Sequence, residues 1–577
     1  MKGRRVLLFV IMVGFLLSSV ACGGSNAPAN TTTAAPATTA AATTTAAAET
    51  TTTKAAETTT EAQPEVDPNV PIYLRDTSPI TFDWYVDESW YTRVKWGQDK
   101  MSQYVTNKTG VALNIIIPQG DQTAKKTVMI ASGDLPDFIG MGQWHTEWRT
   151  MRDAGMLWSF QELAEIYDQS LFDVMKPSIL NYWRHDDGKN YVYTNSAWPL
   201  EDLPNAKYMM NWAVLSARKD MYEGLGRPDM SQPEGFLAAL RAAKEKYPTV
   251  DGKPLIPFLL SREFNSEGNP ALDGMLESRC NIPGNREEEY YTYDKNIHEE
   301  KIRWLRTYNQ AYREGLITPD QMTWNEAMFD NELMSGRAFL NSQAANVACE
   351  YSGPLYQKDP NSIYVPIDAV HNSKGEEPIL QGGGLNGWHV TMITKKCKDP
   401  VRAAQFLHYY LSEEGQSDFY FGDETMHTIK NGRKWLNDDL VVLRTADEVE
   451  FCSVYGGLEA YFMLAQPNFY DEWSQDITPL QKEYYDYFQG KLEYSLSMEA
   501  SQNCEPETNT PAAIALTEVK MKWGEILPRL ITAKDDAEFD SLLAQYKTLS
   551  DKNFPIYGPV QRELYEKNLA KLKAMLG

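Results

Sequence analysis

The order of apolar and polar positions after residue 79 predicts a strand–helix–strand–helix–strand unit. Residues 80–86 are mostly apolar and aromatic, and 90–107 has apolar residues at helical spacing. Residues 111–117 alternate as in a half-buried strand, 125–131 has a helical pattern, and 138–141 is typical of a short buried strand. Strands separated by helices usually pair in parallel, with right-handed crossovers. This part of the chain therefore predicts an α/β lobe with a mainly parallel sheet.

A second α/β pattern follows. Strands are predicted at 208–217, 255–260 and 336–340, and helices at 236–246 and 297–314. The chain has 577 residues, which is long enough for two lobes with separate hydrophobic cores. The fold class predicted from these patterns is α/β.

The remainder of the chain is predicted to be mostly helical. Asp399 and Pro400 suit the N-cap and first position of a helix that continues to residue 415. Loops are expected around 503–511 and 553–559, where proline and asparagine interrupt the helical pattern.

The first 21 residues have the pattern of an export signal. Lys2, Arg4 and Arg5 precede an apolar run at 6–17 that only Gly14 interrupts. A run of about 12 residues is shorter than the roughly 20 that a membrane-spanning helix needs. The sequence therefore predicts a signal peptide at 1–21.

Cys22 follows this run where a lipid attachment site would lie. Ala21-Cys22-Gly23 resembles the bacterial lipobox, in which the cysteine receives a diacylglyceryl group and becomes the mature N-terminus. Ser19 departs from the leucine that usually stands there. The alternative is an ordinary signal peptide with an incidental cysteine. We expect the lipidated form.

The segment after Cys22 has the composition of a disordered tether. Residues 25–67 are nearly all Thr, Ala, Ser, Pro and scattered Glu, so they offer too little apolar surface to offset chain entropy. A flexible chain of this length spans roughly 35–40 Å root-mean-square. We assign 22–70 to the lipidated cysteine and this tether.

Charge and aromatic content narrow the class of partner. The formal net charge is −24 at pH 7, which argues against nucleic acid and against binding to an anionic membrane surface. Aromatic residues make up 12% of the chain. This content suits carbohydrate contact, because sugar C–H faces stack on rings, and it suits a large aromatic core equally well.

The cysteines do not predict a disulfide framework or a metal site. Besides Cys22, five cysteines are widely spread and none forms a CxxC pair. We expect buried free thiols. The five are Cys280, Cys349, Cys397, Cys452 and Cys504.

Catalytic motifs are incomplete. Ser216 and Lys219 match S-x-x-K, but the companion motifs are missing. His298-Glu299 begins H-E-x-x-H, yet Ile302 stands where the second histidine is required. We therefore expect no catalytic residue and no cofactor.

The glycines at 382, 384 and 387 match a dinucleotide-binding fingerprint literally. The run at 388–393 that follows has the pattern of a strand, so the strand–helix context of that fingerprint is absent. We predict a loop before a strand.

Three passages carry a resemblance to a known family. They are Ala131-Ser132-Gly133-Asp134-Leu135-Pro136-Asp137-Phe138, the segment 217–226 with its Arg218-Lys219-Asp220, and the segment 393–400 continuing to Gly415. In order and spacing the chain resembles extracellular solute-binding proteins of family 1, the substrate receptors of sugar ABC importers.

The resemblance implies a two-lobed periplasmic-binding-protein-like fold of type II, with ligand in the cleft and a helical C-terminal part. Lobe 1 would comprise 76–192 plus 341–394, and lobe 2 would comprise 193–340 plus 395–577. Ligand pockets generally lie at such domain interfaces.

The resemblance also implies a function and partners. We expect a non-catalytic monomer that captures an oligosaccharide and delivers it to ABC permease subunits. The lipid on Cys22 would anchor it to the extracellular face of the cell membrane of a Gram-positive bacterium. We expect no nucleic acid among its partners. Two alternatives remain: a surface-anchored polysaccharide-degrading enzyme, and a receptor for a peptide or another small solute on the same fold.

Some members of this family carry a calcium loop in the second lobe. The corresponding stretch here, 245–253, keeps only Asp251 and Gly252. Ca²⁺ takes six or more oxygen ligands. We expect no calcium there and no other metal.

Ligand contacts are expected where strands end at the cleft. The candidates are aromatic residues that can stack on sugars and polar residues that can bind hydroxyl groups; for any one ring, a place in the core or on the lobe surface is an equal alternative. They are Trp84, Tyr85, Glu88 and Trp90, then Gln143, Trp144 and His145, then Asn386 and Trp388, and from the second lobe Trp212 and Glu424.

Overall fold

The computed structural model describes the part of the chain after the predicted tether. The described residues are 69–88, 96–118, 122–205, 209–261, 264–430, 432–457, 463–466 and 479–576. They belong to the second of two compact units, Val66–Gly577. The predicted signal peptide, Cys22, nearly all of the tether and Trp90 lie outside the described residues. No described helix is long and apolar enough to cross a membrane.

The first sheet contains five strands in the order β2-β1-β3-β12-β4. Strand β1 lies between β2 and β3 and pairs in parallel with both, as predicted. The strand β12 returns from far along the chain and pairs antiparallel with β3 and β4. The strands are β1 (Ile80–Val86), β2 (Val111–Ile116), β3 (Phe138–Gly142), β4 (Tyr193–Thr194) and β12 (His389–Ile393).

Helix α1 (Lys100–Thr109) connects β1 to β2; it begins later than the predicted range, 90–107, and ends two residues beyond it. The Asp99 side chain accepts a hydrogen bond from the Ser102 N–H at its N-terminus. Gly110 follows the helix with φ +73°, and a Cβ there would lie 2.1 Å from the Thr77 carbonyl oxygen. Only glycine fits this turn, which sets the start of β2.

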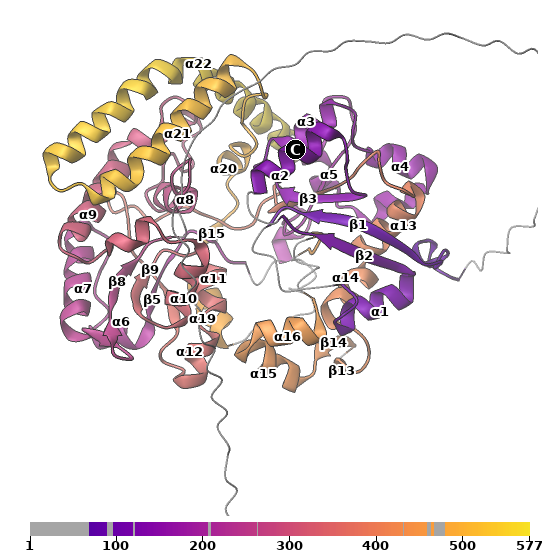
Figure 1. Ribbon diagram of the computed structural model, residues 1–577, viewed down its shortest axis with the longest axis horizontal. Helices are drawn as coiled ribbons and strands as arrows, with labels where there is room; N and C mark the ends of the chain where they lie inside the picture. The colour runs from indigo at the N-terminus through magenta and orange to yellow at the C-terminus, as the bar shows by residue number, and fades with distance from the viewer. Residues whose placement is uncertain are drawn as a thin grey trace, which may run out of the picture. The chain divides into compact units, whose positions relative to one another are not determined.

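Helices flank the first sheet and complete its core (Figure 1). The fully buried members of this core include Phe82, Phe138, Met392 and Tyr410. The helices are α2 (Gln122–Ser132), α3 (Glu147–Asp153), α4 (Phe160–Ile166), α5 (Pro177–Trp183), α13 (Pro400–Leu411) and α14 (Glu413–Phe421).

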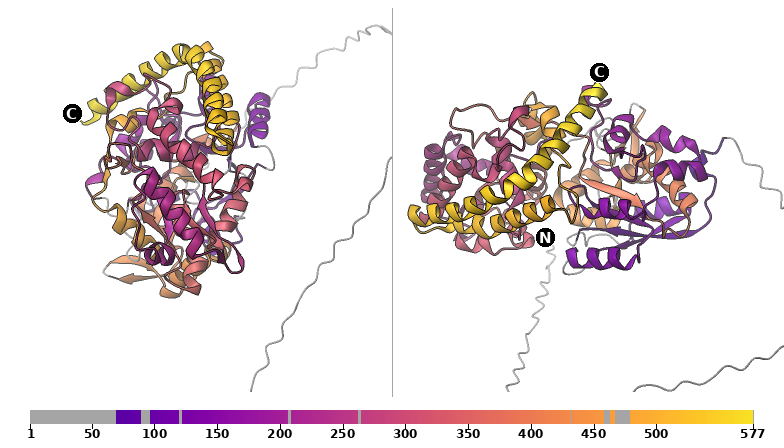
Figure 2. Two further views of the ribbon diagram at one scale, coloured as in Figure 1. Left: turned by 90° about the vertical axis from the view of Figure 1, so that its left-hand side faces the viewer. Right: turned by 90° about the horizontal axis from the view of Figure 1, so that it is seen from above.

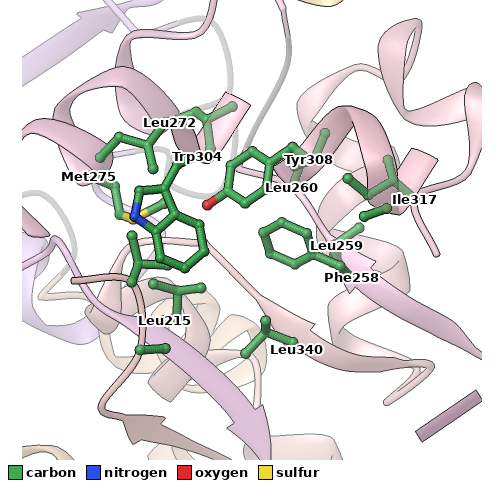
Figure 3. Packing of buried hydrophobic residues seen from close by; sticks show 14 of the residues in the cluster. Leu215, Phe258, Leu259, Leu260, Leu272, Met275, Trp304, Tyr308, Ile317 and Leu340 are labelled. Atoms are coloured by element: carbon green, nitrogen blue, oxygen red, sulfur yellow. The ribbon is translucent and has the colours of Figure 1, made fainter. Parts of the chain in front are cut away.

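The second sheet has four strands in the order β10-β5-β9-β8. Strand β5 is shorter than its predicted range, 208–217. Trp304, Tyr308 and Phe258 are fully buried beside this sheet (Figure 3). The strands are β5 (Leu215–Arg218), β8 (Ile256–Leu259), β9 (Ala338–Asn341) and β10 (Tyr364–Ile367); the helices include α7 (Pro233–Lys246), α8 (Pro270–Arg279), α9 (Glu299–Arg313), α10 (Glu326–Met334), α11 (Ala345–Glu350) and α12 (Gly353–Lys358).

The two cores divide the chain differently from the expected lobes. Residues 345–370 pack in the second core, because β10 pairs with the free edge of β5. Residues 397–419 pack in the first core, because the apolar face of α13 lies against the first sheet's helices. The expected placement of 341–394 in lobe 1 and of 395–577 in lobe 2 is corrected on these points. A strand pattern in sequence does not say which sheet the strand joins.

A third, small hydrophobic cluster lies beside α1 and α14. Its members include Met101, Phe421, Met426 and Phe451. It is built by the hairpin of β13 (His427–Lys430) and β14 (Arg433–Leu436) and by α15 (Asp438–Ala446) and α16 (Glu448–Tyr455).

The C-terminal helices connect the two cores. Helix α21 (Pro511–Thr532) packs along α22 (Asp536–Leu576). Tyr557 of α22 is buried in the second core, whereas Tyr565 is buried in the first. Figure 2 shows α22 running from the helices of one lobe to those of the other.

The loop expected around 553–559 is wrong, since α22 continues through Pro555 and Pro559. Packing of Phe539, Tyr546 and Tyr557 on one side of the helix outweighs the local cost of the prolines.

The five described cysteines confirm the expected free thiols. Each is buried and none forms a disulfide: Cys280, Cys349, Cys397, Cys452 and Cys504.

Candidate functional site

Three segments meet at the carboxyl-terminal edge of the first sheet. Val86 pairs with Gly140, and His389 pairs with Gly142, so the residues after β1, after β3 and before β12 lie at one edge. The Gln143 N–H donates to the Trp388 carbonyl at 3.0 Å. The fold therefore brings together predicted residues from three separate parts of the chain.

Glu88 and His389 form a buried pair at this edge. Nε2 of His389 lies 2.7 Å from Oε1 of Glu88, and the exposed fractions of the two residues are 0% and 8%. The His389 N–H donates to Oδ1 of Asn195 at 2.7 Å, which fixes the start of β12. A carboxylate is thus held in place just beneath the surface of the edge.

Two tryptophans border this pair. Trp144 is 46% exposed, and its ring centroid lies 6.2 Å from that of His389. Trp388 is half-buried and stacks on His389 with centroids 3.7 Å apart. Exposed rings beside a fixed carboxylate offer stacking and hydrogen bonding in one place.

A charged cluster lies behind the edge. Asp87 accepts hydrogen bonds from the Tyr85 hydroxyl and from Nζ of Lys126, each at 2.7 Å. Lys126 also lies 3.2 Å from Nδ1 of His145. Burial and the neighbouring Lys126 ammonium lower the pKa of His145, so its ring is neutral at pH 7. Burial and the Asp87 charge raise the pKa of Tyr85, which stays protonated.

Two of the predicted residues from β1 lie in the core. Trp84 is 1% exposed and stacks on Phe138 with centroids 4.4 Å apart. Tyr85 is fully buried and holds Asp87. The alternation of a strand at a sheet centre places both side chains inside, one on each face, because helices cover both faces.

Asn386 and Glu424 differ in their surroundings. Asn386 is half-buried in the loop before β12, and its N–H donates to Oε1 of Glu499 at 3.0 Å. Glu424 lies in an exposed turn between α14 and β13, flanked by Phe421 and Met426 of the third cluster. Glu424 thus follows a helix that packs in the first core, and not one of the second lobe to which the sequence analysis assigned it.

The corresponding edge of the second sheet carries Trp212. Strands β8 and β9 end there and β5 begins there. Trp212 is 45% exposed, and a Cβ at Gly274 would lie 2.7 Å from its ring. Ser342 and Gln343 follow β9 and Ser261 follows β8. Within the described ranges, Oγ of both serines and Oε1 of Gln343 are buried without a hydrogen-bond partner.

Sequence reasoning did not single out His389, Lys126, Ser342 or Gln343. His389 adjoins the predicted Trp388, so its position in the strand was the available signal. Lys126 lies in α2, and Ser342 and Gln343 follow β9; their places at the sites depend on contacts with distant segments, which no local pattern reveals.

One group in the described part of the chain has the chemistry of metal ligands: Asp368, His371 and Glu377. Oδ1 of Asp368 lies 2.7 Å from the fully buried guanidinium of Arg279 and 3.0 Å from Nε2 of His371. The hydrogen bond from His371 and the Arg279 charge hold the pKa of Asp368 well below its ordinary value. This carboxylate serves Arg279, and a cation beside a guanidinium would be repelled.

The stretch expected to lack a calcium loop forms a hairpin. Strands β6 (Thr249–Val250) and β7 (Lys253–Pro254) pair antiparallel around Asp251 and Gly252, both with positive φ. The Asp251 carboxylate lies 3.5 Å from Nζ of Lys358.

Comparison of the sequence with protein families gives a match. The sequence profile described as bacterial extracellular solute-binding protein matches residues 95–417, more than half of the chain. This chain belongs to that family. It is a family of binding proteins, as the resemblance in the sequence indicated. A search of curated protein sequences finds no match.

Solved structures confirm the two-lobed, type II fold. The alginate-binding protein AlgQ2 without calcium ion aligns with a TM-score of 0.59 and 16% identity, covering 85% of this chain and 98% of the other. FusA of Streptococcus pneumoniae in complex with kestose gives 0.57 and 14%, covering 85% and 100%. The N-glycan transport protein NgtS of the same species, with Man1GlcNAc, gives 0.52 and 13%, covering 85% and 99%.

Proposed function

We propose that this protein is the substrate-binding component of a carbohydrate ABC importer and captures an oligosaccharide between its two lobes. The observation that carries the proposal is the edge of the first sheet, where the buried Glu88–His389 pair lies between Trp144 and Trp388. A fixed carboxylate can accept hydrogen bonds from sugar hydroxyls. The exposed face of Trp144 can stack on a sugar ring.

The second lobe supplies the other wall. Trp212 offers a second exposed ring at the edge of its sheet. The buried oxygens of Ser261, Ser342 and Gln343 have no partner among the described residues, so ligand hydroxyls or water can satisfy them. Closure of the lobes would bring these polar groups to the ligand and remove it from solvent.

The ligands of proteins with this fold support the same class. AlgQ2 is an alginate-binding protein, FusA was solved with kestose and NgtS with Man1GlcNAc. Each of these proteins aligns over nearly its whole length with this chain. An oligosaccharide is therefore the first ligand class to test.

We assign the first core, together with α13 and α14, to the first lobe. The second core, together with α11, α12 and β10, forms the second lobe. Helix α22 would be one of the connections that bend when the lobes close. Ligand-bound and ligand-free small-angle scattering tests this: closure predicts a smaller radius of gyration with ligand.

In the proposed receptor, Cys22 is the mature N-terminal residue and carries a lipid that anchors the protein to the extracellular face of the membrane. Residues 22–70 form the tether that lets the folded part reach its permease. Mass spectrometry of the protein from a bacterial host would find a diacylglyceryl-modified N-terminal cysteine. Cys22→Ala would release the protein from the membrane fraction. An unmodified chain that begins elsewhere would refute the anchor.

A thermal-shift panel tests the ligand class. The probes are kestose, Man1GlcNAc and alginate oligosaccharides, with a set of short peptides as the alternative class. The proposal predicts a raised Tm with at least one sugar, no shift with peptides, and unchanged sugar in the sample afterwards. Shifts with peptides alone, or release of shorter sugars, would overturn it in favour of a peptide receptor or an enzyme.

A further inference from the structure

Glu499 is a buried carboxylate at the segment that leads into the candidate site. It lies in α20 (Leu496–Ala500), which packs against α22, and it is 2% exposed. Facing it is the segment from Leu380 to Trp388, which passes from the second core to β12 of the first sheet. This segment contains Asn386 and Trp388, two of the proposed ligand contacts.

The carboxylate holds this segment by its backbone. Oε1 of Glu499 accepts the N–H groups of Leu385 at 2.8 Å and of Asn386 at 3.0 Å. Oε2 accepts Nε2 of Gln381 at 3.3 Å. A Cβ at Gly384 would lie 2.5 Å from Oε2, so only glycine lets the carboxylate approach this closely.

The rest of the segment is docked on the same stretch of chain. Strand β11 (Leu380–Gln381) pairs in parallel with β15 (Leu492–Glu493), and the Gly382 N–H donates to the Glu493 carbonyl at 2.8 Å. Past Gly382, the Gly384 carbonyl accepts the Trp198 N–H at 2.9 Å. In the portion next to Trp388, the side chains of Trp183 and Thr194 donate to the carbonyls of Leu385 and Asn386, whereas Glu499 accepts the N–H groups of these two residues.

None of the described lysine, arginine or histidine side chains forms an ion pair with Glu499. The titratable groups that face it are the hydroxyls of Tyr182 and Tyr494, whose pKa values are raised by burial and by the Glu499 charge. Both tyrosines remain neutral. Burial raises the pKa of Glu499 to about 7, against the opposing hydrogen bonds from Leu385 and Asn386.

We propose that Glu499 is a positioning residue for the Leu385–Trp388 loop and that its protonation strengthens the docking of this loop near neutral pH. The proposal rests on the proposed function only in taking Asn386 and Trp388 as ligand contacts; docking of the loop is a property of the protein without ligand.

The direction of the pH effect follows from the coupling between docking of the loop and protonation of Glu499. Docking buries Glu499 and raises its pKa, whereas a loop that opens returns the carboxyl to water and to its ordinary value of 4.5. The docked loop therefore binds a proton more tightly than the open loop. Docking is strongest below pH 4.5, weakens as the pH rises towards 7, and is constant above that value. Ligand capture that needs the docked loop would weaken over the same interval.

Amide hydrogen exchange measures this docking directly. Leu385 and Asn386 donate to the carboxylate, so exchange of a peptide covering 380–388 is followed by mass spectrometry without ligand. Rates are corrected for chemical exchange with an unfolded peptide of the same sequence. We expect the opening equilibrium of these amides to rise at least about tenfold between pH 5 and pH 8 in the wild-type protein.

Glu499→Gln is the test variant, because the amide has the shape of the protonated acid. Its exchange should show no pH dependence after correction and should stay close to the slow rate of the wild type at pH 5. Glu493→Gln is the matched control: it makes the same change at an exposed residue of the same stretch and should keep the wild-type profile. Equal pH dependence in Glu499→Gln and wild type would overturn the proposal.

Gly384→Ala gives an independent check. The added Cβ would displace the carboxylate. The amides of Leu385 and Asn386 should then exchange faster at every pH, while near-UV circular dichroism remains that of a folded protein. Unchanged exchange would contradict the positioning role. Because none of these measurements uses a sugar, their failure would leave the oligosaccharide proposal standing, and a failed sugar panel would leave this inference standing.

Discussion

His389 and Glu88 are 301 residues apart in the sequence, yet Nε2 of one lies 2.7 Å from Oε1 of the other. The contact joins the start of β12 to the segment after β1 at the edge of the first sheet. It shows how a returning antiparallel strand completes a candidate site begun by a parallel α/β unit.

Substitution of Glu88 should weaken ligand binding more than it affects folding. Glu88→Ala removes the carboxylate proposed to accept sugar hydroxyls, so we expect at least tenfold weaker binding of whichever sugar raises Tm. Isothermal titration calorimetry measures the change. Glu424→Ala is the control, because that exposed carboxylate lies beside the third cluster, and its affinity should remain within twofold. An equal loss of sugar affinity in both variants would show that Glu88 does not contact the ligand.

Substitution of Trp144 should affect ligand binding, whereas substitution of Trp84 should affect the stability of the fold. Trp144→Ala removes an exposed ring and should weaken sugar binding at least tenfold with little change in the free energy of unfolding. Trp84→Ala empties a core position 1% exposed and should cost about 3–5 kcal/mol of that free energy. Urea unfolding and calorimetry measure the two effects. Unchanged affinity in Trp144→Ala would contradict the proposed stacking.

The buried Arg279 should be sensitive to loss of its partner. Its guanidinium is fully buried and lies 2.7 Å from Asp368. Asp368→Asn leaves the cation without a carboxylate, but the Asp368 side chain is 43% exposed, so we expect the free energy of unfolding to fall by about 1–3 kcal/mol. Arg279→Met with Asp368→Asn should recover part of this loss. If Asp368→Asn alone is as stable as the wild type in urea unfolding, the Arg279–Asp368 pair does not contribute to stability.

The capping box of α4 predicts an acid-dependent loss of stability. Ser159 is fully buried, its N–H donates to Oε2 of Glu162 at 2.9 Å, and its hydroxyl accepts the Glu162 N–H at 3.2 Å. Burial raises the pKa of Glu162, but the hydrogen bonds from Ser159 outweigh it and lower the pKa to about 2. The stabilisation is thus present above pH 4.5 and lost as the pH falls towards 2.

Ser159→Ala should cost about 1 kcal/mol at pH 7. The difference between the variant and the wild type should shrink as the pH falls from 4.5 to 2.5, which urea unfolding at several pH values would show. A constant difference over this interval would mean that the Glu162 carboxylate does not contribute.

Much of the fold follows from local pattern. The strand Ile80–Val86 has its predicted bounds, and Asp399 caps its helix as predicted. These features depend on periodicity and on side-chain to backbone hydrogen bonds within a few residues. The crossings between lobes were misplaced because β10 and α13 join cores through contacts with distant segments. The loop predicted at the prolines of α22 is wrong for the same reason, because packing against distant residues keeps the helix continuous.

The candidate site was predicted in part. Glu88, Trp144 and Trp388 meet because each follows or precedes a strand of one sheet, which the strand pattern implied. Trp84 and Tyr85 are expected to contact ligand at the end of their strand, but both side chains are buried in a core that helices cover on both faces of the sheet. Glu499 could not be found from sequence, since its contact with Leu385 spans 114 residues.

The most direct measurement of the central claim is isothermal titration calorimetry of the purified protein with the oligosaccharides of the thermal-shift panel, with mass spectrometry of the recovered ligand. We expect saturable binding of at least one oligosaccharide, weakened in Trp144→Ala and Glu88→Ala, with the sugar recovered intact. Absence of binding to every oligosaccharide while a peptide binds, or recovery of cleaved sugar, would contradict it.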